Sequence, residues 1–220
     1  MCFSPAADFA IAAAISPVAV ASLRLVRRRE QLLVAALPAV FAAHQFVEGF
    51  VWLGLEGHVS SGLQHAATLI YLLVAQALLP VLVPVALLLV EPDSVRRQRW
   101  LWPLAVLGLA VGVRMLVNLL THPITASASD HVVIYEADRG FGGFTAVAYV
   151  LATCGPAICS SQRMLRWFGV ANLVGLLGAA LIRVAAVTSV WCAYAAFASI
   201  LVLVYLYDSR KDRGRPVPAT

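Results

Sequence analysis

The stretch HQFVEGFVW, residues 44–52, brings an imidazole, an amide and a carboxylate together at helical spacing. His44 and Glu48 are four residues apart, as are Glu48 and Trp52, and Gln45 precedes Glu48 by three. In a helix these side chains therefore share one face. A His/Glu pair at this spacing supplies two ligands to a metal ion from a single helix. The alternative is a buried hydrogen-bonded pair that fixes helix register, and the stretch taken alone favours this alternative.

Thiol groups stand near both ends of the chain. The four cysteines are too few and too scattered for a disulfide framework. Cys2 lies at the tip of the first apolar run, and Cys192 lies just inside the last one. Three interpretations of this pair stay open. They are a disulfide in an oxidising exterior, a metal site shared with His131 and with Glu48 or His44, and two unrelated positions.

The composition decides which elements must position these groups. The chain has 220 residues, of which 61% are hydrophobic and 12% charged, and its mean hydropathy is +0.86. Soluble domains carry about twice that charged fraction, so this is an integral membrane protein. Seven apolar runs are long enough to cross a bilayer: 6–25, 31–55, 66–90, 100–121, 142–159, 165–187 and 189–207. We therefore expect an all-α membrane protein, a bundle of seven transmembrane helices.

Basic residues gather in alternate connections between these runs. They are Arg24, Arg27, Arg28 and Arg29, then Arg96, Arg97 and Arg99, then Arg163 and Arg166, and finally Arg210, Lys211, Arg213 and Arg215. The other connections contain only Arg139. This positive-inside pattern predicts an N-terminus outside and a C-terminus inside. The net charge of +5 is thus a signal of orientation, and no nucleic-acid partner is expected.

The connection after the fourth run is long and alternating. Its segment THPITASASDHVVIYEADRG, residues 121–140, has β-branched stretches at 124–126 and 131–135 on either side of a Ser/Asp turn. It predicts a short β-hairpin lid on the external side. We expect one transmembrane domain over residues 1–208, with the lid at about 121–141. A disordered basic cytoplasmic tail over 209–220 should follow, close to the lipid headgroups.

The ionisable side chains of the apolar runs fall toward the predicted outer side. Charges at membrane depth usually face the bundle interior and pair with one another. Asp8 and Glu48 are therefore expected near Arg114 and Arg183, in a polar cavity open to the outside above an apolar floor. Arginine also suits an anionic ligand. The candidate contacts to a small molecule or ion from the external side are Arg114, Arg183, Gln45, Trp52 and Tyr135.

Several motifs resemble an uncharacterised bacterial membrane-protein family over essentially the whole chain. They are the opening MCFS, the segments HQFVEGFVWL and SVWCAYAA, and the external DHVVIYEAD. The matching positions are Cys2, Ser4, Gln45, Glu48, Trp52, His131, Tyr135, Trp191 and Cys192. The resemblance implies a multi-pass protein of the bacterial cytoplasmic membrane and no particular activity. Its members tend to have glutamine at the position of His44.

Because of that difference, His44 is a less favoured metal ligand than four other candidates: Cys2, Glu48, His131 and Cys192. Two thiolates, an imidazole and a carboxylate suit a tetrahedral site. Zinc is the first choice of cofactor, with copper or iron as alternatives.

Three classes of function are compatible with this sequence. The favoured one is a membrane metalloprotein, extending to a metal-dependent hydrolase or lyase in which Glu48 and His131 do the acid–base chemistry. The second is a small transporter or channel that uses buried Asp, Glu and Arg side chains. The third is a receptor-like bundle closed by a disulfide between Cys2 and Cys192. The sequence does not indicate an oligomeric state.

Overall fold

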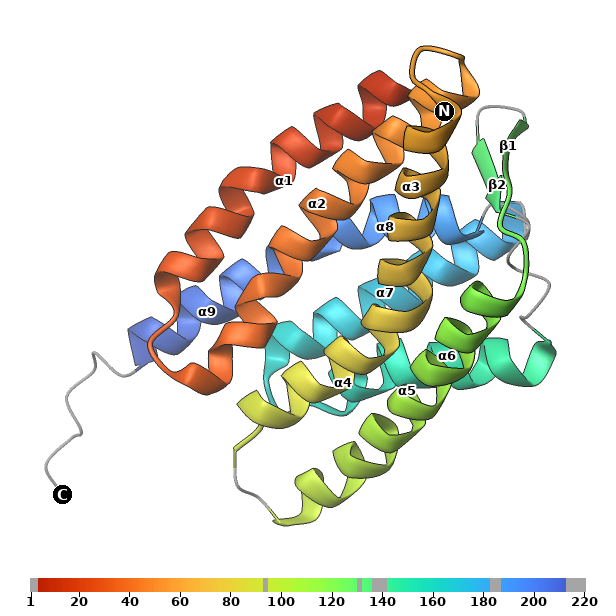
Figure 1. The fold of residues 1–220 in the computed structure, drawn as a ribbon. Coiled ribbons are helices and arrows are strands. Elements are labelled where there is room, and N and C mark those ends of the chain that lie inside the picture. Colours follow the sequence, from red (N-terminus) through yellow and green to blue (C-terminus); the bar gives the residue numbers. More distant parts are fainter. Residues whose placement is uncertain (1–3, 93–94, 130–131, 136–141, 183–186, 213–220) are drawn as a thin grey trace, which may run out of the picture.

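A computed structural model describes residues 4–92, 95–129, 132–135, 142–182 and 187–212 (Figure 1). Its first half contains α1 (Pro5–Leu25), the short η1 (Arg29–Gln31), α2 (Leu32–Leu55), α3 (Ser61–Leu72), the π-helical η2 (Leu73–Leu78), α4 (Leu79–Val90) and α5 (Val95–Thr121). Its second half contains β1 (Ala126–Ser129), β2 (Val132–Tyr135), α6 (Gly143–Cys159), α7 (Arg163–Ile182), α8 (Val187–Ala198) and α9 (Ile200–Asp212).

The predicted helical architecture is confirmed, and its helices have the length and composition of membrane spans. Six helical segments of the described chain are long and apolar enough to span a bilayer: Pro5–Leu25, Arg29–Leu55, Ser61–Val90, Arg99–Thr121, Arg163–Leu181 and Val187–Lys211. Together with α6 they match the seven predicted runs. At 17 residues, α6 is about 25 Å long, a little less than the hydrocarbon core of about 30 Å.

The third span is locally π-helical where proline enters it. Pro80 has no N–H group, so a carbonyl one turn earlier loses its helical donor. Because the turn over Leu73–Leu78 is π-helical, the carbonyl that lacks a backbone donor is that of Ala75, five residues before the proline. The Tyr149 hydroxyl of α6 donates to this carbonyl at 2.5 Å. A neighbouring helix thus satisfies the freed backbone group, as a bilayer requires.

The predicted hairpin is present, but its first strand begins later than expected. β1 and β2 pair antiparallel, with Ala126 opposite Tyr135 and Ser129 opposite Val132. The stretch expected as the first strand, 124–126, therefore overlaps β1 only at its last residue. The register with Val132–Tyr135 places the first strand in the small residues ASAS, 126–129.

The two ends of the bundle differ in chemistry. The beginning of α1, the connection from α2 to α3 and the hairpin lie at one end (Figure 1). The connection from α1 to α2 and the end of α9 lie at the other end, where α9 packs against both α1 and α2. The described basic clusters of the sequence fall at this second end. Candidate polar side chains fall at the first.

The last helix is longer than predicted. α9 runs to Asp212, so the boundary expected at residue 208 lies inside a helix, and 209–212 are not a disordered tail. Arg210 and Lys211 stand in its last turn. Basic side chains there interact favourably with the negative end of the helix dipole, which explains why the helix continues past the apolar run.

Close packing between α5 and the third span depends on Gly108. A Cβ at this position would overlap the Pro80 carbonyl oxygen and approach Pro84 Cγ to 2.9 Å. We therefore predict that Gly108→Ala lowers the free energy of unfolding by about 1–3 kcal/mol through overpacking. Gly178→Ala in α7 is the matched control, because a Cβ there meets nothing within 4 Å. It should be neutral or stabilising by up to about 1 kcal/mol. Thermal unfolding in detergent compares the two, and equal effects would contradict the packing argument.

Candidate functional site

Two buried carboxylates and one amide form the centre of the polar cluster. Asp8, Gln45 and Glu48 are all completely buried. The Gln45 Nε2 group donates to Asp8 Oδ1 at 3.1 Å and lies 3.4 Å from Glu48 Oε2. Asp8 is held in the first turn of α1, where the Ser4 side chain caps the helix and Pro5 starts it. One amide therefore links the carboxylates of α1 and α2.

Glu48 is surrounded by hydroxyl groups from three further elements. The Tyr135 hydroxyl of β2 donates to Glu48 Oε1 at 3.3 Å, and the Tyr71 and Ser189 hydroxyls approach the same carboxylate from α3 and α8. Burial raises the pKa of Tyr135 well above its ordinary value, and the Glu48 carboxylate adds to the increase. The Tyr135 hydroxyl therefore keeps its proton and remains a donor at physiological pH.

Three aromatic rings stack beside this carboxylate. The rings of His44 and Tyr71 are 3.9 Å apart and nearly parallel, and those of Tyr71 and Tyr135 are 4.9 Å apart. The stack joins α2, α3 and the hairpin. His44 is 2% exposed, and neither of its ring nitrogens has a hydrogen-bond partner in the described part of the chain. His44 thus lies beside Tyr71, with both nitrogens available to a ligand or water.

Cys192 belongs to the same cluster. Its thiol is free and buried, it contacts the Tyr71 hydroxyl, and it interacts electrostatically with Glu48. The described structure therefore does not contain the disulfide to Cys192 that the sequence left open. Trp52, one turn beyond Glu48 on α2, is also buried and directs its indole toward Asp8.

The charge balance of the cluster differs from the expected one. Arg114 was expected to neutralise the buried acids, but it is exposed and lines a separate surface pocket between α5 and the start of α6. The reason is helical phase: Val111, Met115 and Leu119 form the buried stripe of α5, and Arg114 lies off it. Among the described residues, no basic side chain forms an ion pair with Asp8 or Glu48.

Three of the predicted site residues, Cys2, His131 and Arg183, lie outside the described residues. Cys2 stands three residues before the start of α1 in the sequence, and His131 is next to the start of β2. Within the described ranges, no three His, Cys, Asp or Glu side chains converge in a way that would hold a metal ion. The catalytic roles of Glu48 and His131, the metal ligands and the zinc cofactor stay predictions.

Sequence reasoning missed part of the cluster. Tyr71 and Ser189 were not among the predicted site residues, and Asp8 was placed only at the mouth of the cavity. A signal for Tyr71 existed: a tyrosine inside the apolar stretch TLIYLL needs a partner for its hydroxyl once buried. The predicted contact residues Gln45, Trp52 and Tyr135 do come together in the cluster.

Fold and cluster together define a multi-pass helical membrane protein with a buried polar centre near one end of its bundle. The chain belongs to a family of unknown function, DUF6629, whose model matches residues 1–218. This finding confirms the resemblance to an uncharacterised family seen in the sequence. No curated protein and no solved structure gives a significant match.

Removing the Tyr135 hydroxyl tests the hydrogen bonding around Glu48. We predict that Tyr135→Phe lowers the free energy of unfolding by about 1–3 kcal/mol, because a buried acceptor loses one donor. Tyr194→Phe in α8 is the control: Tyr194 is 40% exposed, and the change should be within about 0.5 kcal/mol.

A double-mutant cycle with Glu48→Gln, read by thermal unfolding, should give a coupling energy of at least about 0.5 kcal/mol for Tyr135. Strictly additive effects would show that the two side chains do not interact.

Proposed function

We propose that this protein binds a metal ion in the polar cluster at the external side of a bacterial cytoplasmic membrane. The observation that carries the proposal is the pair of fully buried carboxylates, Asp8 and Glu48, bridged by Gln45 without a described basic partner.

A cation explains why two acids remain in an apolar bundle. A buried carboxylate is costly unless it is paired or protonated, and two close together repel each other as well. Natural membrane proteins keep such groups where they serve a function. The bridging Gln45 amide separates the two acids but supplies no positive charge. A bound cation supplies that charge directly.

Glu48 and Cys192 are the described side chains best suited to coordinate it. They are close enough to interact, and they offer an oxygen and a sulfur ligand. Cys2 and His131 are the proposed remaining ligands. Each is within three residues, in the sequence, of the start of an element, α1 or β2, whose residues contact the cluster. A donor set of two sulfurs, one nitrogen and one oxygen favours zinc over harder cations, with copper and iron as competitors.

Metal content tests this proposal. We predict that the full chain, purified from membranes without chelator, contains about one zinc, copper or iron ion per chain by elemental analysis. Glu48→Gln and Cys192→Ser should each reduce metal affinity at least tenfold. Glu91→Gln is the matched control, since Glu91 is also buried but accepts hydrogen bonds from Ser160 and Ser161 at the other end of the bundle. Wild-type protein without stoichiometric metal would overturn the proposal.

Proton-coupled transport is a second candidate, favoured by one specific observation. The third span contains the π-helical turn η2 next to the polar cluster, followed by Pro80 and Pro84. Irregular turns of this kind are frequent at functional sites and allow a span to change shape. Asp8 and Glu48 would then carry the proton, with the shared Gln45 amide between them.

This second candidate predicts proton flux in proteoliposomes that hold a pH-sensitive dye. Under an imposed membrane potential, wild-type vesicles should change internal pH at least ten times faster than vesicles with Glu48→Gln, about the loss expected when a proton carrier is removed. Glu91→Gln vesicles should match wild type. A wild-type rate equal to that of empty liposomes would rule the candidate out.

A further inference from the structure

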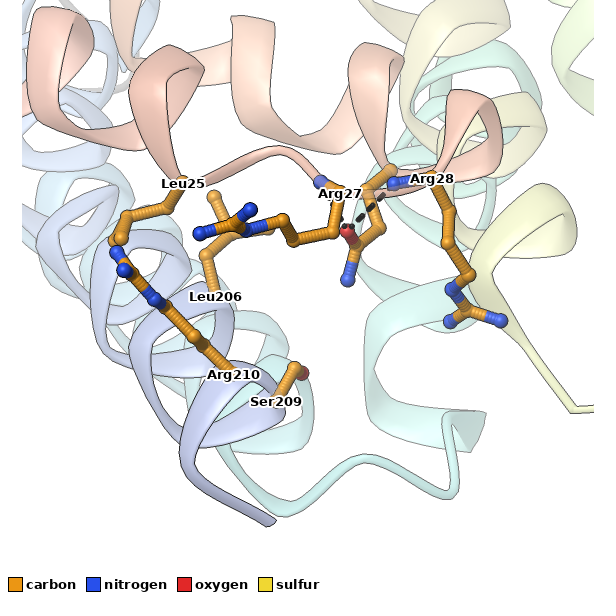
Figure 2. Close-up of a pocket in the computed structure, with 7 residues that line it drawn as sticks. Leu25, Arg27, Arg28, Leu206, Ser209 and Arg210 are labelled. Carbon is orange, nitrogen blue, oxygen red and sulfur yellow. Dashed lines mark hydrogen bonds between the residues drawn. The ribbon is translucent and has the colours of Figure 1, made fainter. Parts of the chain in front are cut away.

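The end of the bundle opposite the polar cluster contains a basic pocket of about 350 Å³. It lies between the connection from α1 to α2 and the last turns of α9 (Figure 2). Its lining residues are Leu25, Arg27, Arg28, Gln31, Leu206, Ser209 and Arg210. Nothing in the proposed function uses these side chains.

The backbone of this pocket is fixed by one buried amide. Gln31 is 4% exposed, and its Oε1 atom accepts the backbone N–H groups of Arg27 (3.1 Å) and Arg28 (3.3 Å). These hydrogen bonds occupy the backbone donors and hold the connection in one shape. The two arginine side chains leave this fixed backbone in different directions (Figure 2).

The pocket gathers positive charge without a compensating acid. The side chains of Arg27 and Arg210 both extend toward the side of the pocket where Leu25 lies (Figure 2), although they come from opposite ends of the chain. No carboxylate of the described residues forms an ion pair with the three arginines, including the neighbouring Glu30 and Asp208. Guanidinium groups directed to one place repel each other unless an anion lies between them, and their forked donors match a phosphate.

We propose that this pocket binds the phosphate group of an anionic phospholipid. Two observations favour a lipid over a soluble phosphate. The pocket lies at the ends of two membrane-spanning segments, Pro5–Leu25 and Val187–Lys211, at the depth of the headgroups. Leu25 and Leu206 give it an apolar wall, against which the start of an acyl chain can pack. Basic pockets between spanning helices recognise anionic headgroups in this way.

Native mass spectrometry of the full chain in neutral detergent tests the proposal. The probes are phosphatidylglycerol, phosphatidylcholine with the same acyl chains, and inorganic phosphate. Wild-type protein should bind phosphatidylglycerol at least tenfold more tightly than phosphatidylcholine. Arg27→Gln combined with Arg210→Gln should weaken binding of phosphatidylglycerol about 30-fold, because each arginine near a headgroup contributes about 1 kcal/mol.

Arg163→Gln combined with Arg166→Gln is the matched control. It removes the same charge from exposed arginines of α7 that do not line the pocket, so phosphatidylglycerol affinity should change less than threefold. Equal weakening in both double variants would overturn the proposal in favour of unspecific surface charge. Displacement of the lipid by millimolar inorganic phosphate would overturn it in favour of a soluble ligand.

A charge-conserving pair keeps the test decisive if the glutamine pair does not fold. Arg27→Lys combined with Arg210→Lys retains the positive charge but removes the forked donors that suit a phosphate. We expect this pair to weaken phosphatidylglycerol binding about fivefold, and an unchanged affinity would contradict the proposed recognition.

Discussion

The hydrogen-bonded bridge from Asp8 through Gln45 to Glu48 is the interaction on which the organisation of this molecule depends. Each carboxylate is completely buried, so each must find donors inside the protein. The polar groups around them come from different parts of the chain. Gln45 of α2 and Tyr135 of the hairpin donate hydrogen bonds, and the hydroxyls of Tyr71 in α3 and Ser189 in α8 lie beside Glu48. The surroundings of the two acids therefore include five elements, and the hydrogen bond from Tyr135 ties the hairpin to α2.

Much of the architecture follows from composition and length, because the bilayer leaves few alternatives for the backbone. Long apolar runs must be helical, and their number and limits were predicted closely. The hairpin was also predicted, since alternating β-branched residues around a short polar turn indicate two paired strands. Its first strand was placed too early. Side-chain preference pointed to 124–126, but the pairing register places Ala126 opposite Tyr135 and Ser129 opposite Val132.

Some residues of the polar cluster could be predicted from the sequence, and others could not. Spacing within one helix placed Gln45, Glu48 and Trp52 on a common face, and these residues do share the cluster. The end of the bundle at which the cluster lies was also predictable, but the direction that each helix faces was not. Arg114 was expected beside the acids and instead lies on an exposed side of α5. Tyr71 was missed for a different reason. It lies within an apolar stretch of the sequence, so its hydroxyl group was not recognised as part of a polar site.

Helix α1 shows why the polar bridge matters for packing as well as chemistry. Its buried stripe consists of Asp8, Ala12, Ile15, Ala19 and Ser22, which is narrow and made mostly of small side chains. Small side chains allow close contact between spanning helices but specify their register weakly.

Two features fix that register at the polar end. The Phe9 ring occupies the space beside Gly49, where a Cβ would come within 2.6 Å of it, and the Asp8 carboxylate binds Gln45 one turn earlier on α2. At the other end, Gln31 holds the connection that returns the chain into α2. A helix with little apolar surface to bury is thus positioned by polar contacts at both ends, and each of these contacts is part of a candidate binding site.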